Sequence, residues 1–382
     1  MPVSELRSGL RQQTTGAFVE LDLTLPYATQ ELPGIGGQLR AAPDAFIVEE
    51  IPLYQASGAG QHLYVNITKE TMTTREVQRA LAEAFDLPYN AVGFAGMKDK
   101  LARATQTFSL LVGHVDDAFV SAAPSRIVTM APVEVNWVRL HRNKLKKGHL
   151  LGNRFTITVD RPAVDSDEAL ARAQAVAAQL RRDGLPNYYG PQRLGQNGAN
   201  VRRGWELLRG QKRMANRWLR SLLLASVQSH LCNRYLALRQ QRGRFSTLLT
   251  GDIAKKHDTG GLFVVADQPA EQGRYDRKEI SFTAPIYGPK MWDAEAESGR
   301  LEQEVLAMSG LEIDSLAKAK MMGTRRLGRI LPDDLSVSQD DAGIVVRFSL
   351  PKGAFATTVL REFMKVPDDL LAQSADDTAD LA

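Results

Sequence analysis

The most restrictive feature of this sequence is a single acid, Asp99, that stands between two lysines. Asp99 has a lysine on each side and follows Gly96, which allows a sharp turn. The apolar run 91–94 predicts a short buried strand before the turn, and the β-rich stretch 105–112 predicts another after it. Ammonium groups within a few ångströms would keep the carboxylate ionised, although a charged turn is also typical of a solvated salt bridge. The sequence thus predicts an acid presented at a strand end.

The wider pattern mixes strands and helices and predicts an α+β fold. Residues 46–51 and 63–68 have the composition of strands, and apolar residues recur at helical spacing in 166–182. From about Lys212 the pattern changes to a long helical stretch followed by glycine-rich turns, and strand-like sequence returns at 343–350. We therefore expect one domain that is interrupted by an insertion.

Charge is distributed unevenly along the chain. The 382 residues carry a net charge of +4, yet residues 366–382 hold five aspartates and neither lysine nor arginine, which predicts an acidic disordered tail. The basic residues gather in two blocks that suit the phosphate backbone of a nucleic acid, although a solvated face is the alternative for each block. The first block is Arg139, Arg142, Lys144, Lys146 and Lys147, and the second is Arg202, Arg203, Arg209, Lys212, Arg213, Arg217 and Arg220.

Composition argues against several classes of protein. Cys232 is the single cysteine, so neither an internal disulfide nor a thiolate metal cluster is possible, and a reducing compartment is expected. The six histidines have no metal-binding spacing. No stretch approaches the roughly 18 uninterrupted apolar residues of a membrane span, and the first residues lack the apolar region of a secretion signal. The sequence predicts a cytoplasmic protein without metal or membrane contact.

Six segments, in the same order along the chain, resemble motifs of the TruD family of tRNA pseudouridine synthases. The segment around Asp99 is similar to the family's Ala-Gly-x-Lys-Asp motif. Residues 39–49 are similar to its basic-x-x-Pro-x-x-Phe-x-Val-x-Glu stretch. The other four are Lys144-Leu-Lys-Lys-Gly148 with Gly152-Asn-Arg-Phe155, Asn187-Tyr-Tyr-Gly-Pro-Gln-Arg-Leu-Gly195, Pro285-Ile-Tyr-Gly-Pro-Lys-Met291 and Leu350-Pro-Lys-Gly-Ala-Phe-Ala-Thr-Thr-Val-Leu-Arg-Glu362.

The resemblance implies a fold and a domain organisation. The fold would be α+β, with a pseudouridine-synthase catalytic domain built on a mostly antiparallel mixed sheet and interrupted by a smaller α/β insertion domain. The catalytic domain would comprise residues 1–211 and 330–365. The insertion would comprise residues 212–329, and the acidic tail would follow at 366–382.

The resemblance also implies an activity and a site. The family isomerises uridine to pseudouridine in tRNA without a cofactor or metal, usually at uridine-13 of the D arm, and its motif aspartate is the catalytic nucleophile. Asp99 matches that aspartate, and Arg40 matches a basic position that would keep it ionised. The residues implied to bind substrate are Phe46, Lys98, Asn187, Tyr189 and Phe355.

These residues also have ordinary structural interpretations. Phe46 and Phe355 are typical of packed aromatics, Asn187 of a turn cap, and Arg40 of a surface salt bridge. For the whole chain, the alternatives are a non-catalytic RNA-binding or RNA-folding factor, and a synthase that acts on other RNA positions. A tRNA is the predicted partner, and a monomer is expected.

Overall fold

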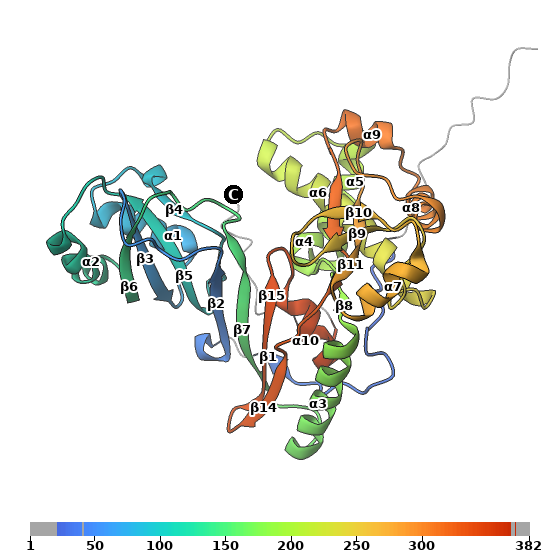
Figure 1. Ribbon diagram of the computed structural model, residues 1–382, viewed down its shortest axis with the longest axis horizontal. Coiled ribbons are helices and arrows are strands. Elements are labelled where there is room, and N and C mark those ends of the chain that lie inside the picture. The colour runs from blue at the N-terminus through green and yellow to red at the C-terminus, as the bar shows by residue number, and fades with distance from the viewer. Residues whose placement is uncertain (1–20, 40–41, 368–370, 372–382) are drawn as a thin grey trace, which may run out of the picture.

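The computed structural model describes residues 21–39, 42–367 and 371. These residues form two halves, each with its own sheet and helices, which lie side by side in Figure 1. The predicted basic residue Arg40 and most of the predicted acidic tail lie outside the described residues.

A mixed sheet forms the framework of the first half. Its strand order is β14–β15–β7–β2–β5–β3–β6, with β1 beside β7 and β4 beside β5. The pairs are antiparallel except that β2 runs parallel to β5. The predicted α+β fold on a mostly antiparallel mixed sheet is thus confirmed. The strands are β1 (Gln38–Leu39), β2 (Phe46–Pro52), β3 (His62–Lys69), β4 (Val92–Phe94), β5 (Arg103–Leu111), β6 (Val133–His141), β7 (Leu150–Asp160), β14 (Ser336–Asp340) and β15 (Gly343–Pro351).

Helices α1 (Thr74–Ala84), α2 (Asp117–Met130), α3 (Ser166–Asp183) and α10 (Ala356–Met364) pack on one face of this sheet. The helix α3 begins where the Asp165 side chain accepts a hydrogen bond from the Glu168 backbone N–H, and it ends at Gly184, whose φ is +74°. Its buried residues are Ala169, Ala173, Val176, Ala177 and Leu180, which recur at helical spacing and face the sheet. The helix predicted over 166–182 is therefore confirmed almost to the residue.

The second half contains an antiparallel four-stranded sheet with the order β10–β9–β11–β12. Its hydrophobic core includes residues from Tyr188 to Met321, so the segment 188–211 contributes to it as well. None of the helices in the described ranges is long and apolar enough to cross a membrane. The strands are β9 (Ile253–Lys256), β10 (Leu262–Val264), β11 (Ile280–Ile286) and β12 (Thr324–Leu327), and the helices are α4 (Pro191–Leu194), α5 (Ala199–Leu208), α6 (Arg217–Gln241), α7 (Gln268–Asp276), α8 (Ala296–Ser309) and α9 (Ile313–Lys318).

A short two-stranded sheet lies where the chain enters and leaves the second half. Strand β8 (Leu185–Pro186) pairs with β13 (Arg329–Ile330), with Leu185 opposite Ile330. The backbones approach so closely that a Cβ added to Gly184 would lie 2.5 Å from the Ile330 carbonyl oxygen. The chain therefore enters and leaves the second half at one place.

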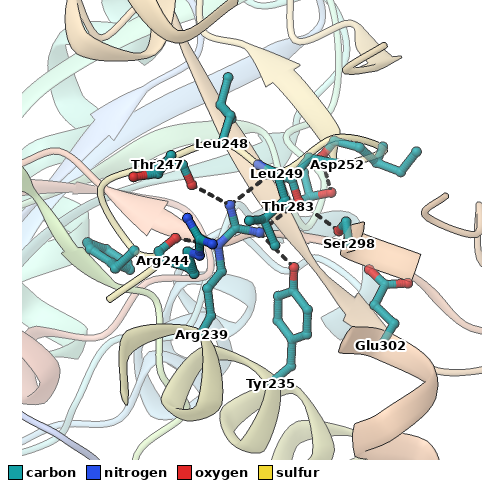
Figure 2. A network of polar contacts seen from close by, with 12 residues as sticks. Tyr235, Arg239, Arg244, Thr247, Leu248, Leu249, Asp252, Thr283, Ser298 and Glu302 are labelled. Carbon is teal, nitrogen blue, oxygen red and sulfur yellow. Dashed lines mark hydrogen bonds and ion pairs between the residues drawn. The ribbon is translucent and has the colours of Figure 1, made fainter. Parts of the chain in front are cut away.

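A buried ion pair ties the helices of the second half to its sheet (Figure 2). The Arg239 guanidinium on α6 donates to both carboxylate oxygens of Asp252 at 2.7 Å, and neither side chain is exposed. The same guanidinium donates to the Tyr235 hydroxyl and to the backbone carbonyls of residues 244 and 247, and it lies 3.7 Å from the Phe282 ring centroid. Asp252 also accepts from the Ser298 hydroxyl on α8. Every polar atom of the pair is thus satisfied, which is the condition under which a buried ion pair is tolerated.

Candidate active site

The loop that carries Asp99 lies on the helix-covered face of the large sheet. Strand β2 turns Val48 toward this face, and the parallel register places Ala104 of β5 beside Val48. The Gln106 amide on the same face of β5 donates to the Gly96 carbonyl at 3.3 Å. Ala102, at the end of the loop, is buried in the same core as Val48. The strand–turn–strand unit predicted around Asp99 is therefore present.

Strands β2 and β4 share one edge of β5, because β3 occupies the whole of the other edge. Strand β2 pairs with residues 103–105 and β4 pairs with residues 108–110. The backbone N–H of Thr107 falls in the gap between them, where it donates to Glu50 Oε1 at 3.4 Å. The Glu50 side chain thus accepts the hydrogen bond that the backbone of a neighbouring strand would otherwise accept.

Lys98 reaches into this gap from the loop. Its ammonium nitrogen lies 3.0 Å from Glu50 Oε2, and each side chain is only 3% exposed. The Lys98 backbone N–H donates to the Thr74 hydroxyl at the start of α1, and Lys69 donates to the Asp99 carbonyl oxygen at 2.5 Å. The backbone on both sides of the Asp99 side chain is therefore held in place. This arrangement favours a positioning role for Lys98 over the direct substrate contact that the resemblance implies.

We expect Glu50→Gln and Lys98→Met each to lower the free energy of unfolding by about 3–5 kcal/mol, because each leaves one buried partner uncompensated. The double variant should lose clearly less than the sum of the two single losses. Urea denaturation of the four proteins measures this coupling. Strictly additive losses would show that the two side chains act independently.

A second cluster forms where β12 meets the start of α10. The Arg326 guanidinium lies 3.8 Å from the Tyr189 ring centroid and 5.9 Å from that of Phe355. The two rings are tilted toward each other with their centroids 6.0 Å apart. Asn187 is 4% exposed and accepts from Arg326 at its side-chain oxygen (2.6 Å) and donates to the Leu327 carbonyl (2.9 Å). The structure thus brings three predicted residues together around Arg326, and Asn187 holds that arginine.

Arg326 itself was not predicted from the sequence. It lies in Thr324-Arg-Arg-Leu327, where nothing distinguishes it from other surface arginines. Its importance comes from packing with residues that are far away along the chain. Burial raises the pKa of the Tyr189 phenol, so this ring stays neutral beside the guanidinium.

The two clusters are linked by aromatic residues on the same face of the sheet. The Phe46 ring at the start of β2 meets the Phe155 ring edge-on at 6.3 Å, and Phe155 stacks on Phe348 at 5.3 Å. Ala356, next to Phe355 in the chain, is buried in the same core. Phe46 and the start of α10 therefore lie on the face that carries the Asp99 loop.

Asn153 is a further candidate that the sequence reasoning did not single out. It is two residues before Phe155 in β7, so it points to the same face, and it stands opposite Glu50 in β2. Its side-chain oxygen is buried and has no hydrogen-bond partner among the described residues. An unsatisfied buried acceptor costs about 1–3 kcal/mol, which is expected where a ligand supplies the donor. The signal in the sequence was the Gly152-Asn-Arg-Phe155 segment.

The described residues contain no group of three or more His, Cys, Asp or Glu side chains arranged to hold a metal ion. Besides the paired Glu50, the polar groups of the site are the Asp99 carboxylate, one amide with a free oxygen, and cations that are already bonded within the protein. Such a site suits chemistry on a carbon centre by a carboxylate.

The chain matches the family model for tRNA pseudouridine synthase D (TruD) over residues 22–217 and 212–363. A tRNA pseudouridine synthase D of Thermus thermophilus is 41% identical over 357 residues, which cover 93% of this chain and 97% of that protein. The enzyme of the same name from Anaeromyxobacter sp. strain Fw109-5 is 40% identical over 353 residues, which cover 90% and 97%. The crystal structure of the putative tRNA pseudouridine synthase D from Methanosarcina mazei has the same fold, with a TM-score of 0.73 at 22% identity over 90% of this chain and 97% of that one.

The fold and these similarities define a pseudouridine synthase, which is an isomerase. More closely, the chain belongs to the TruD family of tRNA pseudouridine synthases, as the motifs of the sequence indicate.

Proposed function

We propose that this enzyme isomerises uridine-13 in the D arm of tRNA to pseudouridine, with Asp99 as the nucleophile. The observation that carries the proposal is the loop of Asp99, which is fixed by Lys98, Thr74 and Lys69. It stands on the same sheet face as an unpaired buried acceptor, Asn153 Oδ1. A carboxylate on a loop with a fixed backbone, on the same sheet face as an unpaired acceptor, suits a reaction at the sugar of a nucleoside whose base is held nearby.

The reaction exchanges one bond to the sugar for another. The Asp99 carboxylate attacks C1′, the C1′–N1 bond breaks, and uracil leaves with the electron pair. The base then turns, and C5 bonds to C1′ as the carboxylate departs. The proton on C5 passes to water, and N1 takes up a proton from water, so the pyrimidine ring is restored with no net change in protons. The atoms balance within the nucleoside and the enzyme, and no external reductant, oxidant or co-reactant enters.

The enzyme must bind the uracil base while the base is detached from the sugar. The uracil N3–H is a donor, and Asn153 Oδ1 is the buried acceptor that would receive it. Phe46 and the Tyr189–Arg326–Phe355 group are the flat side chains that would hold an extruded base. Extrusion is required because the reacting atoms are otherwise stacked inside a folded RNA.

The test of this proposal is an assay with an unmodified tRNA transcript that contains uridine-13 and a matched transcript with cytidine at that position. Carbodiimide treatment followed by primer extension reports pseudouridine by position. We expect a stop at position 13 of the first transcript and none in the second. Stops elsewhere would assign the enzyme to another RNA position, and tight binding without any product would favour the non-catalytic RNA-binding alternative.

We expect Phe355→Ala to lower kcat/KM by about one to two orders of magnitude, because stacking on an aromatic face contributes about 1–3 kcal/mol per base. Tyr89→Ala is the matched control, since Tyr89 is an aromatic residue of the same half that is 45% exposed and lies outside the site. Unchanged turnover in a well-folded Phe355→Ala enzyme would remove Phe355 from the site.

A further inference from the structure

The start of α6 carries three arginines that form no ion pair with any described residue. Arg217 and Arg220 lie in the first turn of the helix, and Arg213 lies in the loop before it. No aspartate or glutamate occurs in residues 207–251. The other charged basic residues of that stretch, apart from Arg209, have acidic partners from elsewhere in the chain. These pairs are Lys212–Glu206, Arg234–Asp22, Arg239–Asp252, Arg242–Glu304 and Arg244–Glu297.

Trp218 stands among these arginines and is 43% exposed. We call Arg213, Arg217, Trp218 and Arg220 the arginine–tryptophan patch. Residues 217 and 220 are neighbours on the helix surface. The first turn contains no acid, so cations crowd the positive end of the helix dipole. The free protein gains nothing from this arrangement, whereas a bound polyanion would make it favourable.

The helix that carries the patch is rigidly joined to the candidate site. Asn233 of α6 accepts from the Tyr189 backbone N–H (2.8 Å) and donates to the Tyr189 carbonyl (2.9 Å). Ser226 of α6 donates to the carbonyl of Arg193. At 1.5 Å per residue, Arg217 lies about 24 Å along the helix from Asn233. In Figure 1 the start of α6 extends from its own half of the molecule toward the half that contains α1 and β5.

We propose that the arginine–tryptophan patch is a second RNA contact, in which the arginines bind phosphates and Trp218 stacks on an unpaired base other than the reacting uridine. Exposed aromatic rings between guanidinium groups are the arrangement by which proteins hold single-stranded nucleotides. A membrane surface is disfavoured because membrane-bound helices need several exposed apolar residues, and in this patch one ring is exposed. That the RNA is a tRNA rests on the proposed function.

Equilibrium binding of an unmodified tRNA transcript to the full-length protein at several salt concentrations tests the proposal. We expect Trp218→Ala to weaken binding about tenfold and Trp218→Phe to retain most of the affinity. The triple change of Arg213, Arg217 and Arg220 to alanine should reduce the salt slope by about two to three units. Matched controls are Trp292→Ala, which removes a similarly exposed tryptophan of the same half, and Arg242→Ala, which removes a paired arginine of the same stretch.

The outcomes separate the patch from the reaction. If wild-type enzyme forms pseudouridine while all patch variants bind tRNA with unchanged affinity and salt slope, the patch proposal is wrong and the proposed function stands. If wild-type enzyme forms no pseudouridine but the patch variants lose tRNA binding, the patch stands and the reaction is wrong. Patch-dependent binding to phosphatidylserine vesicles, with tRNA binding unaffected, would assign the patch to a lipid surface and overturn the proposal.

Discussion

Asp99→Asn is expected to abolish pseudouridine formation and to leave tRNA affinity within about tenfold of wild type. The amide preserves the shape of the side chain but cannot attack C1′ as an anion. Binding depends mainly on phosphate contacts, which this change does not touch. The loop should keep its conformation, because Lys98, Lys69 and Thr74 hold its backbone through groups that the substitution leaves intact.

Single-turnover assays with excess enzyme measure the remaining activity, and Asp44→Asn is the matched control. Asp44 is an exposed acid just before β2 and outside the proposed site. Pseudouridine formed by pure Asp99→Asn enzyme at a rate near wild type would remove Asp99 from the role of nucleophile. Loss of both product and tRNA binding would point to a structural role for the carboxylate.

Arg239→Met is expected to lower the free energy of unfolding by about 3–5 kcal/mol. The change leaves the Asp252 carboxylate in a fully buried position without its bidentate partner. It also removes the donors to the backbone carbonyls of residues 244 and 247 (Figure 2). Chemical denaturation provides the measurement.

Arg242→Met is the control for this prediction, because it breaks a half-exposed pair with Glu304 near the end of the same helix. A loss below about 1 kcal/mol is expected there. The combined variant Arg239→Met/Asp252→Leu should recover part of the stability, since a paired charge is removed together with its partner. A small loss for Arg239→Met alone would mean that water reaches the network.

The local structure of this chain follows from its sequence where short-range signals are strong. Apolar spacing predicts α3 to within a residue, and its ends are fixed by Asp165 and Gly184 through capping and positive φ. The turn around Gly96 likewise follows from one glycine between two β-rich runs. The family motifs predicted that the residues of the aromatic cluster belong to one site.

Contacts between segments that are far apart in the sequence do not follow from such short-range signals. The Lys98–Glu50 pair joins the loop to β2, and it fills the gap on β5 between the residues that pair with β2 and those that pair with β4. Residue spacing does not reveal that two strands share an edge. The sequence does not predict the role of Arg326 for the same reason. Its partners Tyr189 and Phe355 come from other parts of the chain. The family resemblance implies a substrate contact for Lys98, and the burial of its side chain against Glu50 favours a positioning role instead.

The closure of the second half by β8 and β13 has a consequence for how such a chain diversifies. Antiparallel partners lie about 5 Å apart at their Cα atoms, so Leu185 and Ile330 could be joined directly by a tight turn. The segment between Leu185 and Ile330 could therefore be exchanged as one unit without changing the path of the rest of the chain. Its exchange would nevertheless take Arg326, Asn187 and Tyr189 with it. A graft between related enzymes would therefore alter the wall of the proposed uridine site together with any RNA-binding surface on the segment.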